Sequence, residues 1–291
     1  MKRPPTPVEE QAATGETGRI YHDIRQTLRV SGVNLNFRTW AGFDRFFPLM
    51  WQAMRDVAGS GRFEAAGDEV RAEAARLASG LSAVGVTNGQ ILGESQRLQI
   101  KGALELYHYI NPKLLVFTST VARALEREGP RAAVRIPGVR LPRGAPPHMF
   151  PMEMVDEHPN DARIRRLFDD IKQTMQLRSV NSDYRTLAMW PDYLERAWSK
   201  LKPIVASETY TQASATISSI AKAHAWELLD HIDLDRAALA RSGEDVDAVI
   251  ETTARFERLL PPLILNIAVI GLDWWSTDDL ARSPFPVEVL S

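Results

Sequence analysis

The chain has 291 residues, of which 44% are hydrophobic and 25% are charged, the balance of an ordinary globular protein with one or two domains. Lys and Arg total 35 against 37 Asp and Glu, so no excess of positive charge is available to neutralise phosphates, and nucleic acid is not an expected partner. The absence of cysteine excludes disulfides, thiolate nucleophiles and thiolate metal sites. The start, MKRPPTPVEEQ, is polar and Pro-rich, unlike a secretory signal.

The predicted elements are helices separated by one long connector. In the first part of the chain, apolar side chains recur at helical spacing in two stretches: Ile20, Tyr21, Ile24 and Leu28, then Phe63, Val70, Ala74 and Leu77. Residues 129–160 hold seven of the 18 prolines and are expected to form an irregular connector. After the connector the helical spacing returns at Ile164, Leu167, Phe168, Ile171 and Met175.

The most apolar run of the chain, residues 259–275, is interrupted by two prolines, an asparagine and an aspartate. It is shorter than the ~20 apolar residues of a membrane-spanning helix. We therefore expect a buried helix in a cytoplasmic protein that has no membrane partner. Alternating strand patterns are absent, so the sequence predicts an all-α fold.

The strongest internal signal is a repeat with an offset of 147 residues. Residues 23–41 (DIRQTLRVSGVNLNFRTWA) align without gaps on residues 170–188 (DIKQTMQLRSVNSDYRTLA), with nine identities in nineteen positions. We therefore predict an N-terminal helical repeat over 1–128, the Pro-rich connector over 129–160 and a C-terminal helical repeat over 161–291. Two such units are expected to pack about a pseudo-twofold axis, with an active site between them.

Three pairs of residues align at the most informative part of this repeat: Asn34 with Asn181, Leu35 with Ser182, and Asn36 with Asp183. Asn, Ser and Asp before an apolar helical run are preferred N-cap residues, so capping explains both copies. Capping does not explain why Asn36 becomes Asp183, the member of that pair that can ionise and accept a proton. The difference makes Asp183 a candidate general base.

A second candidate is Asn111, which precedes Pro112. Because a residue before proline is disfavoured in a helix, we expect Asn111 to be the N-cap at a junction between two helices. Its counterpart in the second copy is Pro261, which has no amide side chain.

One set of residues has the spacing of metal ligands, namely His224, Glu227 and His231, which share a helix face. No matching carboxylate and histidine set is found on another helix of the repeat, so no metal site is predicted. The sequence also has no Gly-rich phosphate loop, Walker pattern or nucleophile elbow.

The chain resembles the group I 2-haloacid dehalogenases, all-helical enzymes that need no cofactor and act on D- or on both enantiomers of 2-haloalkanoic acids. The resemblance spans nearly the whole chain and is carried by YHDIRQTLRV at 21–30, YINPKLL at 109–115, residues 170–203 and SPFP at 283–286. It implies hydrolysis of D-2-haloalkanoic acids to 2-hydroxy acids with inversion, by direct attack of a water on the α carbon.

The resemblance also assigns roles to residues. Asp183 matches the catalytic Asp that activates the water, and Asn111 matches the Asn that helps to hold it. Ser182 and the N–H groups of that helix start are candidate donors to the substrate carboxylate. Asn181 resembles the Asn of D-specific members, where members that accept both enantiomers have Ala.

Two positions depart from the family pattern. Where many members have a pocket Trp after Pro, this chain has Ser31 and Gly32, which removes a large ring. The family's Tyr in the second copy is Phe256 here, and Leu35 and Phe256 are expected to line the pocket.

Two alternatives remain open. A catalytically silent relative would bind a small carboxylate or serve as a helical assembly scaffold. Within enzymes, Asp183 would instead act as a nucleophile and form an ester. A homodimer is possible in either case.

Overall fold

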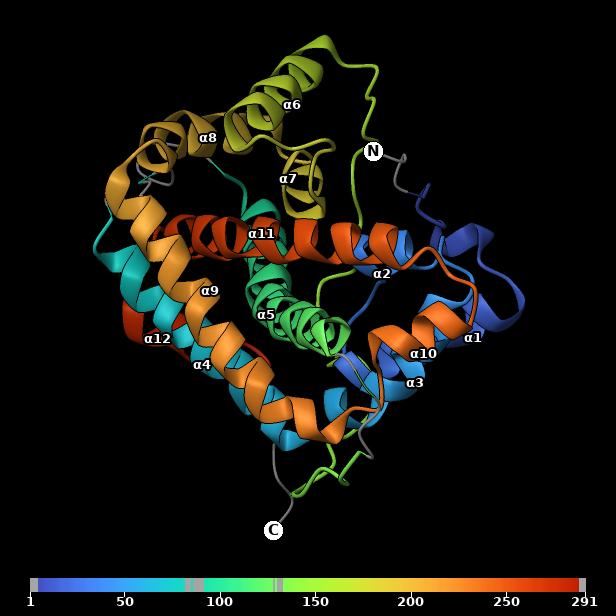
Figure 1. Cartoon of the computed structure of the whole chain (residues 1–291). Coiled ribbons are helices and arrows are strands. Elements are labelled where there is room, and N and C mark those ends of the chain that lie inside the picture. The colour runs from blue at the N-terminus through green and yellow to red at the C-terminus, as the bar shows by residue number, and fades with distance from the viewer. Residues whose placement is uncertain (1–4, 82–84, 86–91, 128, 130–132, 288–291) are drawn as a thin grey trace.

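The computed structural model describes residues 5–81, 85, 92–127, 129 and 133–287 (Figure 1). Within these ranges the chain is helical and forms no strand, which confirms the predicted all-α class. The helices are α1 (Gly15–Leu28), α2 (Leu35–Trp40), α3 (Phe46–Ala58), α4 (Gly61–Ser79), α5 (Glu94–Glu126), α6 (Ala162–Met175), α7 (Ser182–Leu187), α8 (Pro191–Val205), α9 (Glu208–Leu228), α10 (Arg236–Arg241), α11 (Val246–Gly271) and α12 (Thr277–Ala281).

The apolar stripes read from the sequence face the core. Ile24 and Leu28 of α1 and Phe168 and Ile171 of α6 are each at most 1% exposed. Burial of one helical face in this way supplies most of the stability of such helices. Met175 and Leu77, at the ends of their stripes, are half-buried.

Two long helices, α5 and α11, lie at the centre of the molecule, and α4 and α9 lie together on one side of them (Figure 1). α11 packs against α5, and both pack against α4 and α9 (Figure 1). Residues 259–271 of the expected buried helix lie in α11, where most residues from 260 to 271 are buried, whereas residues 272–275 lie beyond the end of this helix. Among the described residues, no helix is both long enough and apolar enough to cross a membrane.

Helices separated by 147 residues have the same local structure. α1 and α6 each have 14 residues and end at a left-handed residue, Arg29 with φ 59° and Gln176 with φ 53°. α2 and α7 each have 6 residues. These agreements support our interpretation of the chain as two copies of one helical unit.

Equivalent tertiary contacts follow the same offset. Trp51 Nε1 donates to Asp23 Oδ2 at 2.8 Å, and Trp198 Nε1 donates to Asp170 Oδ2 at 2.7 Å. Each bond ties the third helix of its copy to the first, because the indole is buried and its N–H must find an acceptor.

The correspondence begins earlier than the sequence indicated. Val8 N donates to the Arg38 carbonyl at 2.9 Å, and Val155 N donates to the Arg185 carbonyl at 3.1 Å. Val155 lies within the segment 129–160 that the sequence assigned to the connector. The equivalent bond is thus formed by a residue that precedes the proposed start of the second copy at residue 161.

Asn111 is not the N-cap of a helix, contrary to expectation. α5 continues through Asn111 and Pro112, both of which are buried. Pro112 has no N–H to donate to the carbonyl of His108 four residues earlier. Arg71 Nε donates to that carbonyl at 3.1 Å, and Arg71 Nη2 donates to the Tyr109 carbonyl at 3.4 Å. The guanidinium thus replaces the missing helical donor.

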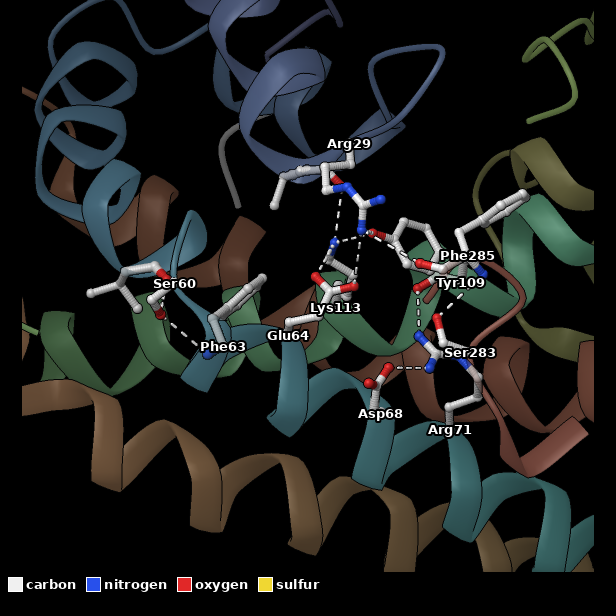
Figure 2. A network of polar contacts seen from close by, with 12 residues as sticks. Arg29, Ser60, Phe63, Glu64, Asp68, Arg71, Tyr109, Lys113, Ser283 and Phe285 are labelled. Carbon is white, nitrogen blue, oxygen red and sulfur yellow. Dashed lines mark hydrogen bonds and ion pairs between the residues drawn. The ribbon is translucent and has the colours of Figure 1, made fainter. Parts of the chain in front are cut away.

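A buried ionic network joins α1, α4 and α5 (Figure 2). Lys113 is fully buried, and its Nζ lies 2.8 Å from Glu64 Oε2 and donates to the Leu28 carbonyl and Tyr109 Oη, each at 2.9 Å. Burial lowers the pKa of Lys113 to about 8. Burial raises the pKa of Glu64, but Lys113, Tyr109 and Arg71 together outweigh burial and hold this pKa below its usual value.

The end of the chain packs on this network. Arg29 Nη1 donates to Tyr109 Oη at 3.3 Å and to the Phe285 carbonyl at 3.4 Å. The Phe285 ring lies edge-on to the Tyr109 ring, with 5.3 Å between centroids. The SPFP segment is therefore anchored by both polar and aromatic contacts to the helix that carries Asn111.

We predict that Glu64→Gln lowers the free energy of unfolding by about 3–5 kcal/mol, because it leaves the buried Lys113 cation without its counter-charge. Urea denaturation at pH 7 measures this. Glu73→Gln on the same helix is the control: its partner Arg76 is exposed, so little change is expected. Equal effects of the two substitutions would contradict the importance of burial.

Candidate active site

A cavity of about 40 Å³ lies where the starts of α2 and α7 meet α5 and α11. This volume has room for water molecules, each of which needs about 10–15 Å³ by the same measure. The structure brings all six sequence-predicted site residues to its wall. The lining residues are Asn34, Leu35, Asn36, Tyr107, Asn111, Leu114, Asn181, Ser182, Asp183, Phe256, Leu260 and Leu263.

Half of the wall consists of equivalent positions from the two copies. Residues 34–36 and residues 181–183 line the cavity together, and they lie 147 residues apart. The backbone before α2 and α7 is almost identical, with φ −68° and ψ 157° at Asn34 and φ −67° and ψ 156° at Asn181. The two copies therefore present their helix starts to one shared cavity.

Asp183 and Asn111 form the polar contact of the cavity. Asn111 Nδ2 donates to Asp183 Oδ2 at 3.4 Å, and the two residues are 4% and 3% exposed, respectively. The bond joins the start of α7 to the middle of α5. A carboxylate and an amide are thus held side by side at the wall of a water-sized space.

The environment of Asp183 raises its pKa to about 7. Burial is the largest cause, because it disfavours the charged form; the backbone N–H groups of Asp183 and Tyr184 and the amide of Asn111 act in the opposite direction. The donors and the dipole of a helix start would by themselves lower the basicity of this residue. Burial outweighs that effect, so the carboxylate is a better base near neutral pH than an exposed aspartate.

Asn34 and Asn181 do not cap their helices through their side chains, which corrects the capping interpretation. Both occupy the N-cap position by backbone conformation, but neither side chain accepts a bond from its helix. The Oδ1 atoms of both are buried and have no partner in the protein. Because both residues line the cavity, their amides are available to a bound molecule instead.

Several contacts hold the start of α7 in place. Tyr107 Oη lies 2.7 Å from Thr186 Oγ1, which donates to the Glu153 carbonyl at 2.6 Å. On the other side, Asn266 Nδ2 donates to Tyr184 Oη at 2.6 Å. These bonds tie α7 to α5, to the connector and to α11. They fix the orientation of the helix that carries Asp183.

The remaining wall is apolar. Leu35, Leu114, Leu260, Leu263 and Phe256 surround the polar groups. The Phe256 ring also contacts the Trp40 ring edge-on, at 6.2 Å between centroids, which links α11 to α2. An apolar wall with a few fixed polar groups is the usual construction of a small-molecule site.

Gly32, where many family members have Trp, does not line the cavity. A Cβ added to Gly32 would lie 2.8 Å from Met152 Cβ, so a side chain there would displace the connector. Ser31 Oγ also donates to the Phe150 carbonyl at 2.8 Å. The connector therefore packs against the position that the Trp of other members would occupy.

The sequence reasoning missed four lining residues on the long helices, namely Tyr107, Leu114, Leu260 and Leu263. Tyr107 and Leu114 lie four residues before and three residues after Asn111, and this helical spacing could have indicated that they face the same cavity.

The histidines considered as metal ligands lie elsewhere: His224 Nε2 is 3.0 Å from Glu69 Oε2, and His231 Nδ1 is 2.8 Å from the Val134 carbonyl.

Comparison with known proteins identifies the family. Residues 31–184 match the model of the family described as "Halocarboxylic acid dehydrogenase DehI". An "(R)-2-haloacid dehalogenase" of Pseudomonas putida is 30% identical over 282 residues, 90% of each chain. A configuration-inverting 2-haloacid dehalogenase of Pseudomonas sp. (strain 113) is 32% identical over 227 residues, 75% of this chain and 73% of the relative.

A solved structure has the same fold over nearly its whole length. The structure of a D-2-haloacid dehalogenase in complex with L-LA superposes with a TM-score of 0.84 and 27% identity, covering 92% of this chain and 96% of that one. The chain therefore belongs to the halocarboxylic acid dehydrogenase DehI family, which confirms the family expected from the sequence.

The raised pKa of Asp183 makes this residue a cost to stability at neutral pH. Between pH 4 and 7 the unfolded chain has released this proton while the folded chain retains it, so the contribution of this group to stability falls as pH rises. We predict that Asp183→Asn is more stable than the parent at pH 8, by on the order of a few kcal/mol, and that the difference shrinks toward pH 4.

Thermal or urea denaturation at several pH values measures this difference. Asp170→Asn is the control with the opposite sign, because Lys202 and Trp198 hold the pKa of Asp170 below its usual value. That substitution should destabilise the protein at neutral pH. An Asp183→Asn variant that is less stable than the parent at pH 8 would contradict the prediction.

Proposed function

We propose that the chain removes halide from D-2-haloalkanoic acids by hydrolysis, giving 2-hydroxy acids of inverted configuration. The observation that carries this proposal is the pairing of buried Asp183, with a pKa of about 7, and Asn111 at the wall of one cavity. The membership of a family whose relatives are named 2-haloacid dehalogenases supports the choice of reaction.

The chemistry requires a positioned base. Water is a weak nucleophile toward a saturated carbon unless a base takes its proton as it attacks. In the proposed step, the water oxygen bonds to the α carbon, the carbon–halogen bond breaks with its electron pair leaving on the halide, and Asp183 accepts the water proton. The proton then passes to solvent, and the carboxylate is restored.

Asn111 suits the task of holding the water. Its amide nitrogen donates to Asp183 Oδ2, while its carbonyl oxygen is a hydrogen-bond acceptor. A water between the Asn111 oxygen and the Asp183 carboxylate would be fixed at two points. Such positioning converts the attack into an effectively unimolecular step.

Ser182 and Asn181 are proposed to bind the rest of the substrate. Both line the cavity directly before Asp183 in the chain. The Ser182 hydroxyl can donate to the substrate carboxylate, and the larger side chain of Asn181 would block one placement of the substituent on the α carbon. Leu35 and Phe256 supply the apolar surface for the carbon chain. The names (R)-2-haloacid dehalogenase, of a relative, and D-2-haloacid dehalogenase, of a solved structure, agree with the proposed selectivity.

We predict that the purified protein releases chloride from D-2-chloropropionate much faster than from the L enantiomer, and that Asp183→Asn lowers kcat by at least about 100-fold. Halide release is measured for each enantiomer separately, with unchanged circular dichroism as proof of folding. No release from either enantiomer, together with binding of a small carboxylate, would favour the silent relative.

Labelled water separates the two roles open to Asp183. In a single turnover in ¹⁸O-water, direct attack places the label in the hydroxy acid, whereas attack by Asp183 through an ester leaves the label in the protein. We expect the label in the product.

The homodimer remains a proposal that sedimentation of the active protein can decide.

The activity should depend on pH through Asp183. Because the base must be ionised and its pKa is about 7, kcat/KM should rise through pH 7 and level off above pH 8. Below pH 6 the rate should fall by about tenfold per pH unit. Initial rates of halide release from pH 5 to 9 measure the profile. A rate that is flat from pH 5 to 8 would rule out a base with this pKa.

A further inference from the structure

Asn36 is a buried polar side chain that the proposed mechanism does not yet use. It is 3% exposed and lines the same cavity as Asp183. Both its Nδ2 and its Oδ1 are buried without a partner in the protein. Of the other amides that line the cavity, Asn34 and Asn181 have only the oxygen in this state, and Asn111 is bonded to Asp183.

A buried N–H donor without a partner in the protein is costly, so such a group calls for a bound water, ion or ligand, or for a catalytic role. The substrate of the proposed reaction has two groups that accept hydrogen bonds, its carboxylate and its halogen. The halogen becomes a full anion as it leaves. A fixed N–H group directed at developing negative charge is a recurrent way to stabilise a transition state.

The position of Asn36 favours the halide. Asp183 and Asn111 belong to α7 and α5, which pack together, whereas Asn36 belongs to α2, which packs on α11. In Figure 1, α7 lies above the middle of α11, whereas α2 lies near its right-hand end. In an in-line displacement the halide moves away from the attacking water and hence away from the end of the cavity that holds the base.

We propose that Asn36 is a halide-binding residue, whose Nδ2 donates to the halogen as the carbon–halogen bond breaks. This inference rests on the proposed dehalogenation. Asn36 and Asp183, which are equivalent in the repeat, would then act on opposite sides of the α carbon. Asp183 accepts the proton of the water, and Asn36 stabilises the leaving anion. An amide is suited to the second task and a carboxylate is not, because a carboxylate would repel the halide.

The test is the effect of Asn36→Leu, which keeps the side-chain volume and removes both polar atoms. For D-2-chloropropionate we expect kcat to fall by about 10- to 100-fold, the usual range for loss of one hydrogen bond to a charged group. For D-2-bromopropionate the fall should be several-fold smaller, because bromide is a better leaving group and a weaker hydrogen-bond acceptor. Asn160→Leu, at an exposed position of the connector, is the matched control and should change neither rate.

Halide binding is measured apart from catalysis. Bromide should raise the melting temperature of the parent protein, and it should do so much less for Asn36→Leu. If Asn36→Leu does not fold, the smaller Asn36→Ala is used for the same two measurements. A parent protein that binds bromide through Asn36 but releases no halide would overturn the proposed reaction while leaving the anion site in place.

Other results would overturn the inference itself. Equal losses of kcat for the chloro and bromo substrates would mean that Asn36 supports the structure and not the leaving group. A raised KM with unchanged kcat would place the amide on the substrate carboxylate. An unchanged effect of bromide on the melting temperature in an active parent and its Asn36→Leu variant would show that the halide binds elsewhere.

Discussion

The arrangement of the residues around the cavity depends on the burial of one carboxylate. Asp183 is 3% exposed, and taking its charge out of water raises its pKa to about 7. A buried charge needs nearby donors, which the start of α7 and the Asn111 amide supply. Their partial compensation leaves the group neutral in mild acid and ionised in mild base. If Asp183 is the proposed base, its pKa suits neutral pH, and the same burial makes the fold less stable there.

The helix that carries Asn111 is held from its far side. Pro112 interrupts the hydrogen bonding of α5 one residue after Asn111, and Arg71 bonds to the carbonyl that the proline leaves without its donor. Lys113 then joins the same helix to α4 through its ion pair with Glu64 and to α1 through a hydrogen bond to the Leu28 carbonyl (Figure 2). Asn111 is therefore placed by residues that never touch the cavity, and the geometry of the site depends on the packing of the whole first copy.

Much of this arrangement could be predicted from one sequence. The helical class, the apolar faces and the pairing of residues 34–36 with residues 181–183 follow from spacing and from the internal alignment, because core-facing patterns and duplicated segments are local signals. The family resemblance added the roles proposed for Asp183 and Asn111. The structure then brought the expected site residues to one wall.

The features that the sequence did not predict have a common physical cause: each depends on contacts with residues that are distant in the chain. A proline normally ends a helix, and no local pattern shows that Arg71, about 40 residues away in the chain, repairs the break at Pro112. An asparagine before a helix normally caps it, and no local pattern shows that the side chains of Asn34 and Asn181 make no cap bond to their helices and line a cavity instead. The rise in the pKa of Asp183 likewise depends on burial by other helices.

The paired lining of the cavity has a consequence for how such a site can arise. If the repeating unit once existed as a separate chain, two identical copies would have formed this cavity across a twofold interface, and every residue in its wall would have been present twice. Two buried carboxylates facing one small space repel each other, so one would be forced to keep its proton. Joining the copies into a single chain removes that constraint, because residues 36 and 183 can then change independently. Covalent linkage would therefore allow a cavity with a symmetric backbone to carry different side chains at its two equivalent positions, as an in-line displacement requires.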